Sequence, residues 1–151
     1  MTDHRGAIEN LLYTYAEAID AGDYEAIGAL FAHGAIADAD GTPMVVGAQA
    51  VTAMYVASTR KYEDGTPRSH HVTTNPLIEI ADDEKTAICR SRFTVFQQTD
   101  EIPLQPIITG SYTDAFEQVD GKWRFVERRM RPTLYGDLSK HLFMDVVPPK
   151  D

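Results

Sequence analysis

Apolar residues recur every three or four positions from Ala7 to Asp20, and this spacing predicts an amphipathic helix. The helix is expected to end at Ala21-Gly22, because glycine favours the end of a helix, and Asp23 is a suitable N-cap for a second helix. The apolar face of the first helix consists of Ile8, Leu11, Leu12, Tyr15 and Ile19.

The second helix is expected to close at His33-Gly34. A small hairpin follows, with strands over residues 35–39 and 42–46 and a turn at Asp40-Gly41. A third helix is predicted from Ala48 to about Thr59. Apolar runs separated by turn residues then predict four long strands, over residues 69–81, 85–98, 107–118 and 122–131.

After the strands, Leu138 to Phe143 suggests a short helix. Helices that come first and strands that follow indicate an α+β fold, in which the helices pack on one face of a curved antiparallel sheet. A curled sheet covered by helices forms a cone with a pocket for a ligand. Pro76 interrupts the first long strand and indicates an edge position or a bulge.

The 151 residues suit one domain, and no linker or internal repeat divides them. The 23 acidic and 14 basic residues give a net charge of −9, which argues against nucleic acid or an anionic membrane as a partner. The apolar runs are shorter than a membrane span, and the polar N-terminus does not resemble a signal peptide. The single cysteine, Cys89, fits a reducing compartment, so we expect a cytoplasmic protein.

Asp20 is the first candidate for chemistry, because it lies in the last turn of an apolar helix, where the helix dipole disfavours a negative charge. A solvated carboxylate at a helix end is the alternative interpretation. His70 and His71 open the first long strand and must face opposite sides of it. The alternation of residues leaves open which of them faces the cone, since a bulge at Pro76 would shift the register.

Three segments together resemble the SnoaL-like branch of the nuclear-transport-factor-2-like superfamily, in the same order along the chain. They read IENLLYTYAEAIDAGDYEAIGALFA, SHHVTTN and ITGSYTDAFEQVDGKWRF. The resemblance covers the chain from about Ile8 to Pro132 and implies a cone-shaped α+β barrel. It is closest to the subgroup of scytalone dehydratase and lindane dehydrochlorinase, in which an aspartate orients a histidine that removes a proton from carbon.

In this sequence the resemblance assigns the aspartate to Asp20 and the histidine to His71. It places Arg128 and Tyr112 where the dehydrochlorinase has cavity residues. We therefore expect Asp20 and His71 to be catalytic, and Arg128, Tyr112, Tyr15 and Ile108 to contact the substrate. A histidine base needs neither a metal nor an organic cofactor.

The expected function is that of a lyase or isomerase acting on a small apolar molecule, cyclic or polyketide-like. The alternative is a module without catalytic activity that binds a ligand or assembles through its sheet, like the small subunits of ring-hydroxylating dioxygenases. Arg128 also lies beside Arg129 and Arg131, a cluster that suits a solvated strand face. The outer face of a half-open sheet predicts a homodimer or a homotrimer.

Overall fold

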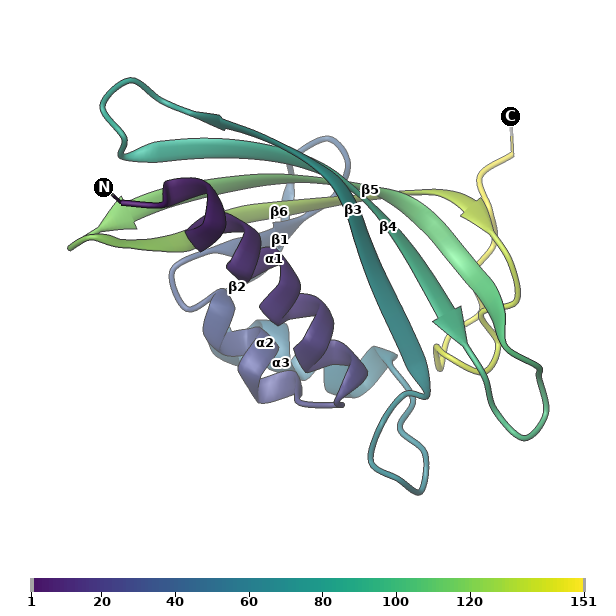
Figure 1. The fold of residues 1–151 in the computed structure, drawn as a ribbon. Coiled ribbons are helices and arrows are strands. Elements are labelled where there is room, and N and C mark those ends of the chain that lie inside the picture. Colours follow the sequence, from purple (N-terminus) through teal and green to yellow (C-terminus); the bar gives the residue numbers. More distant parts are fainter. Residues whose placement is uncertain (1, 151) are drawn as a thin grey trace.

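The structure is a computed structural model that describes residues 2–150. It contains three helices and six strands, and the helices lie on the concave side of the curved sheet (Figure 1). The elements are α1 (His4–Asp20), α2 (Tyr24–Leu30), β1 (Ala35–Ala37), β2 (Pro43–Val46), α3 (Ala48–Ser58), β3 (Ser69–Ile80), β4 (Thr86–Gln97), β5 (Gln105–Val119) and β6 (Lys122–Tyr135).

Helix α1 begins three residues before the predicted start, because the side chain of Asp3 caps it by accepting a hydrogen bond from the backbone N–H of Gly6. It ends at Asp20 as expected. Gly22 then adopts a φ of 72°, and Asp23 caps α2. Helix α2 ends at Leu30, before the predicted His33-Gly34.

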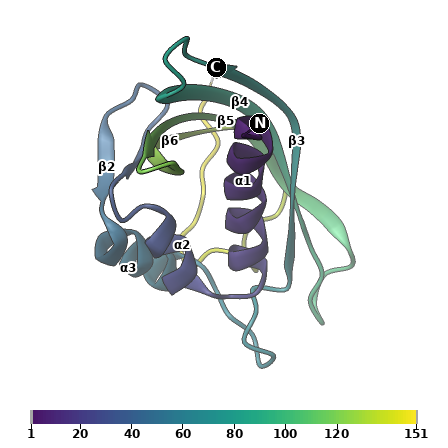
Figure 2. The same cartoon turned by 60° about the vertical axis from the view of Figure 1, so that its left-hand side comes forward.

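The strands form one sheet in the order β2-β1-β6-β5-β4-β3. All neighbouring pairs are antiparallel except β1 and β6, which are parallel, so the sheet is mixed rather than purely antiparallel. Its two ends do not pair with each other, and the sheet stays open while it curls around α1 (Figure 2). The predicted α+β class is confirmed.

The core lies between the helices and the concave face of the sheet. From α1 it receives the predicted apolar positions, of which Ile8, Leu12, Tyr15 and Ile19 are buried. The sheet contributes alternate residues of β4 and β5, as expected for strands with one covered face. Among the described residues 2–150, no helix is both long enough and apolar enough to cross a membrane.

A bulge in β3 changes which of its residues face the core. The pairing with β4 shifts between Thr74 and Leu77, where Asn75 has a φ of 54° and precedes Pro76. The shift lets His71 on one side of the bulge and Ile78 on the other both face inward, although their numbers differ in parity. The bulge at Pro76 is therefore confirmed.

The predicted short helix from Leu138 to Phe143 is wrong. These residues form turns, and Leu142 makes an isolated bridge to Thr59 after α3. The reason is that their backbone groups bond to another part of the chain: the carbonyl of His141 accepts from the N–H of Arg60, and the N–H of Phe143 donates to Ser58. In a helix, the N–H of Phe143 would instead donate to the carbonyl four residues earlier.

Candidate functional site

Asp20 and His71 are in direct contact. Nδ1 of the His71 ring lies 2.6 Å from Oδ1 of Asp20, which is a short, charge-assisted hydrogen-bond distance. The end of α1 brings the carboxylate to the start of β3, 51 positions later in the sequence. The His71 side chain is 7% exposed and that of Asp20 is 20% exposed, so the contact is largely shielded from water.

Two further donors hold the Asp20 carboxylate. The backbone N–H of His71 donates to Oδ2 at 2.7 Å, and the hydroxyl of Ser69 donates to Oδ1 at 2.9 Å. Burial opposes ionisation of Asp20, but its hydrogen bonds to His71 and Ser69 and the charge of His71 outweigh burial, so its pKa is lowered. Asp20 is thus an ionised, fixed acceptor rather than a solvated helix end.

His71 faces inward, while His70 is exposed on the other side of the strand. This arrangement resolves the choice that the alternation of residues left open. With Asp20 ionised, Nδ1 of His71 carries the proton that is donated to the carboxylate. In the neutral ring, Nε2 then holds a free lone pair, which is the atom able to accept a proton from a substrate.

Arg128 is fully buried and does not belong to a solvated face. Its Nε and Nη2 donate to the two oxygens of Asp114 at 2.8 and 2.9 Å, which makes a bidentate ion pair. Its neighbours Arg129 and Arg131 are exposed, so the strand separates the cluster into one inner and two outer side chains. Asp114 raises the pKa of Arg128 against the opposing effect of burial, and the guanidinium stays charged.

Aromatic rings enclose this ion pair. The guanidinium carbon of Arg128 lies 4.2 Å from the ring centre of Tyr15 and 3.8 Å from that of Tyr112, both within cation–π range. The hydroxyl of Tyr15 bonds to that of Tyr55 on α3. Burial raises the pKa of all three tyrosines, which therefore remain protonated hydroxyls at neutral pH.

The register of the sheet separates the two clusters. His71 pairs with Val95 of β4, whereas Asp114, the partner of Arg128, pairs with Cys89. About 20 Å of extended strand lies between those two positions of β4. Phe93 occupies part of this interval and stacks on Tyr112 with ring centres 4.5 Å apart. The structure brings Arg128, Tyr112 and Tyr15 together, but it does not bring Arg128 to the Asp20–His71 pair.

Ile108, the remaining predicted contact, is nearer to the dyad in register. It pairs with Val95, the same residue of β4 that pairs with His71 on the other side. Its side chain is partly buried and packs against the core. Ile108 therefore lies in the same cross-strand row as His71, two strands away.

Sequence reasoning missed three residues of these clusters: Ser69, Asp114 and His141. His141 comes from the C-terminal segment, and its ring centre lies 6.1 Å from that of His71. Asp114 could have been found from the sequence. In a hairpin that turns at Asp120-Gly121, residues at equal distances from the turn face each other, and this places Asp114 within one residue of Arg128. No local signal in the sequence marks His141.

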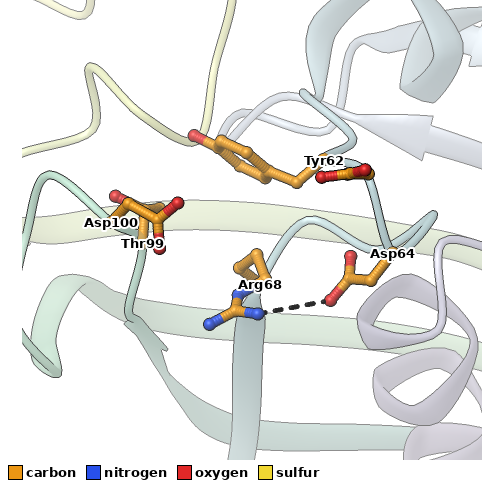
Figure 3. A pocket seen from close by; sticks show the side chains of 6 residues that line it. Tyr62, Asp64, Arg68, Thr99 and Asp100 are labelled. Carbon is orange, nitrogen blue, oxygen red and sulfur yellow. Dashed lines mark hydrogen bonds and ion pairs between the residues drawn. The ribbon is translucent and has the colours of Figure 1, made fainter.

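A polar hollow lies on the surface beside the loop that precedes β3 (Figure 3). Arg68 and Asp64 form an ion pair in its lining, with a nitrogen–oxygen distance of 3.5 Å, and Asp20 and His71 are not among its lining residues. The lining of the hollow consists of Tyr62, Glu63, Asp64, Arg68, Thr99 and Asp100.

Within residues 2–150, no group of three His, Cys, Asp or Glu side chains is arranged to hold a metal ion.

The fold recurs in solved structures. A putative scytalone dehydratase from Novosphingobium aromaticivorans is 26% identical with a TM-score of 0.66, and the match covers 89% of each chain. A protein of unknown function from Mycobacterium tuberculosis is 25% identical with a TM-score of 0.68, covering 85% of this chain and 71% of that one. The hexachlorocyclohexane dehydrochlorinase of Novosphingobium barchaimii shares the fold, at 20% identity and a TM-score of 0.67, over 96% of this chain and 94% of that one.

No curated protein matches the sequence. The structural neighbours include proteins described as having an NTF2-like or cystatin-like fold. Residues 1–129 match the SnoaL-like domain, which is most of the chain. The protein therefore belongs to the SnoaL-like family, as the three sequence segments predicted.

Proposed function

We propose that the protein is a cofactor-independent lyase or isomerase that acts on a small, largely apolar molecule. His71 is the general base in this proposal, and Asp20 orients it. The single observation that carries the proposal is the 2.6 Å contact between Asp20 Oδ1 and His71 Nδ1. A carboxylate on one ring nitrogen fixes the tautomer and stabilises the imidazolium that forms when the other nitrogen accepts a proton.

The reaction begins when Nε2 of His71 takes a proton from a carbon of the substrate. The electron pair of the broken C–H bond then forms a carbon–carbon double bond. In an elimination, a group on the neighbouring carbon leaves with its bonding pair. In an isomerisation, a double bond already present in the substrate opens, and its electron pair takes the proton back from the imidazolium at another carbon. In both cases Asp20 keeps its charge and offsets the positive charge on His71.

The setting of the dyad supports proton transfer. The low exposure of the pair strengthens the interaction between His71 and Asp20, because little water screens it. The C-terminal segment packs over this region through Leu138 and His141, both buried. This packing shields the reacting atoms from water.

The other predicted contacts have separate parts in the proposal. Ile108 supplies apolar surface in the row of His71, and Tyr15 and Tyr112 supply aromatic surface farther along the inner face. Arg128 contributes a fixed positive charge at that end, largely offset by Asp114. A non-catalytic binding module needs no ordered carboxylate–imidazole pair, so the dyad favours the catalytic alternative.

Proton removal can be tested before the natural substrate is known. A panel of cyclic ketones and β-hydroxy ketones is incubated with the protein in D₂O, and hydrogen exchange at carbon is followed by NMR. We expect His71→Gln to slow the exchange by about 10²–10⁴-fold and Asp20→Asn to slow it as well. His70→Gln is the matched control, because this neighbour is exposed on the opposite face, and it should exchange at the wild-type rate.

Retention of the wild-type exchange rate by His71→Gln would overturn the proposal. Mass spectrometry of small molecules that copurify with the protein extends the panel to compounds from the cell. Folding of each variant is checked by circular dichroism, so that a loss of exchange is not a loss of structure.

A further inference from the structure

The C-terminal segment carries a second histidine to the dyad. The ring of His141 lies 6.1 Å from the ring of His71, centre to centre, with 51° between their planes. No hydrogen bond is formed between the two rings among the described contacts. At this separation one small molecule can contact both rings, with a polar atom at His141 and a C–H bond at His71.

The backbone around His141 is held in place from two directions. The N–H of Arg60 donates to the His141 carbonyl at 2.8 Å, and Nε of Arg60 donates to the Leu142 carbonyl at 3.0 Å. From the end of β4, the side-chain amide of Gln97 donates to the Lys140 carbonyl at 3.0 Å. His141 is therefore positioned by the elements that also frame the dyad, and not by a free chain end.

The His141 side chain has an unused bonding capacity. The residue is 6% exposed, yet its Nδ1 is buried and has no hydrogen-bond partner within the described part of the chain. A buried polar atom without a partner is costly and is uncommon in folded proteins. A purely structural role leaves this atom unexplained, whereas a polar group of a bound molecule would satisfy the ring.

We propose that His141 is a further substrate-contacting residue, whose ring N–H donates a hydrogen bond to a carbonyl oxygen of the substrate beside the proton that His71 removes. This inference rests on the proposed function and narrows its substrate class. The substrate is an apolar molecule with an oxygen next to the acidic C–H. A hydrogen bond to that oxygen stabilises the negative charge that develops there when the proton leaves.

The electrostatics of His141 agree with this role. Burial lowers its pKa to about 4, with a further contribution from His71 and an opposing one from Asp20. The ring is therefore neutral at pH 7, with one nitrogen that donates and one that accepts. A neutral donor does not compete with His71 for the Asp20 carboxylate as a second cation would.

Phenol serves as the probe, because it presents one hydroxyl on an apolar ring. Protein with ¹⁵N-labelled histidine is titrated with phenol at pH 7, and the ring nitrogens of His71 and His141 are observed by NMR. We expect both rings to shift, and phenol to bind His141→Phe about tenfold more weakly than the wild type, as for one lost hydrogen bond in a shielded site. His141→Gln, which keeps a donor and an acceptor, should recover most of the affinity.

Met144→Ala is the matched control in the same segment, since Met144 is exposed, and it should bind phenol like the wild type. A shift of His71 alone, or equal affinity in His141→Phe, overturns this inference while the His71 base stands. Absence of a shift in both rings also overturns it, and the deuterium-exchange experiment then decides separately on the dyad. The wild-type titration needs no variant, so a folding defect in His141→Phe does not remove the test.

Discussion

The pH dependence of folding stability offers a direct measure of how completely His141 is buried. Burial, assisted by His71, lowers its pKa from 6.5 to about 4 in the folded protein. In the unfolded chain the same ring titrates near its ordinary value. Between these two pH values the unfolded state binds more protons than the folded state. The contribution of the neutral His141 ring to the free energy of unfolding is therefore fully present above pH 6.5 and decreases as the pH falls toward 4.

The size of this effect follows from the two pKa values. One pH unit over which one extra proton is bound corresponds to about 1.4 kcal/mol. Over the full interval, His141 alone lowers the free energy of unfolding by about 3 kcal/mol. That amount is a large part of the total stability of an ordinary domain, which is about 5–15 kcal/mol.

The assay compares the wild type with His141→Phe by urea unfolding at several pH values from 7 to 4, with the fluorescence of Trp123 as the signal. Phenylalanine has no ionisable group, so position 141 no longer binds a proton in the variant. All other ionisable groups are common to both proteins. The stability difference, wild type minus variant, should therefore fall by about 3 kcal/mol across this range. A difference that stays constant with pH would refute the reasoning, and Met144→Ala should follow the wild-type curve.

Three further predictions follow from the fold. Asp114→Asn leaves the buried charge of Arg128 without its partner, so it should lower the free energy of unfolding by about 3–5 kcal/mol in urea titrations, and a change below 1 kcal/mol would contradict the buried ion pair. Asn75→Val should destabilise by about 1–2 kcal/mol, because a side chain branched at Cβ disfavours the φ of 54°, whereas Asn75→Gly should be nearly neutral. Light scattering should give the mass of two or three chains, as the exposed Leu77 and Ile88 on the outer face suggest, and a monomer would contradict this expectation.

Local patterns predicted the three helices and the order of helices and strands along the chain. The stripe from Ile8 to Ile19 and the cap at Asp23 are local signals, and both were confirmed. The helix prediction for the C-terminal segment was wrong because it also relied on a local pattern. Backbone groups of this segment bond to Ser58 and Arg60, which are far away in the sequence. The parallel pairing of β1 with β6 is likewise a long-range contact without a local signature.

The candidate site shows how far register limits prediction. The position of Asp20 at a helix end singled it out, and the resemblance paired it with His71. The inward direction of His71, however, depends on where the bulge near Pro76 falls, and the sequence shows only that a bulge is favoured. A second bulge, between Ala115 and Phe116, shifts the pairing of β5 with β6 by one residue, so that Asp114 pairs with Arg128 instead of with Glu127. One-residue shifts of this kind decide which side chains meet inside the sheet, and alternation alone does not locate them.

The tautomer of His71 tests the central claim most directly, because the proposed base requires a proton on Nδ1 and a free Nε2. Long-range ¹H–¹⁵N NMR of histidine-labelled protein distinguishes the two ring nitrogens at a pH where the ring is neutral. We predict that in the wild type the Nδ1 proton is retained and Nε2 is unprotonated, and that Asp20→Asn weakens this preference. A neutral His71 that carries its proton on Nε2 in the wild-type protein would contradict the account.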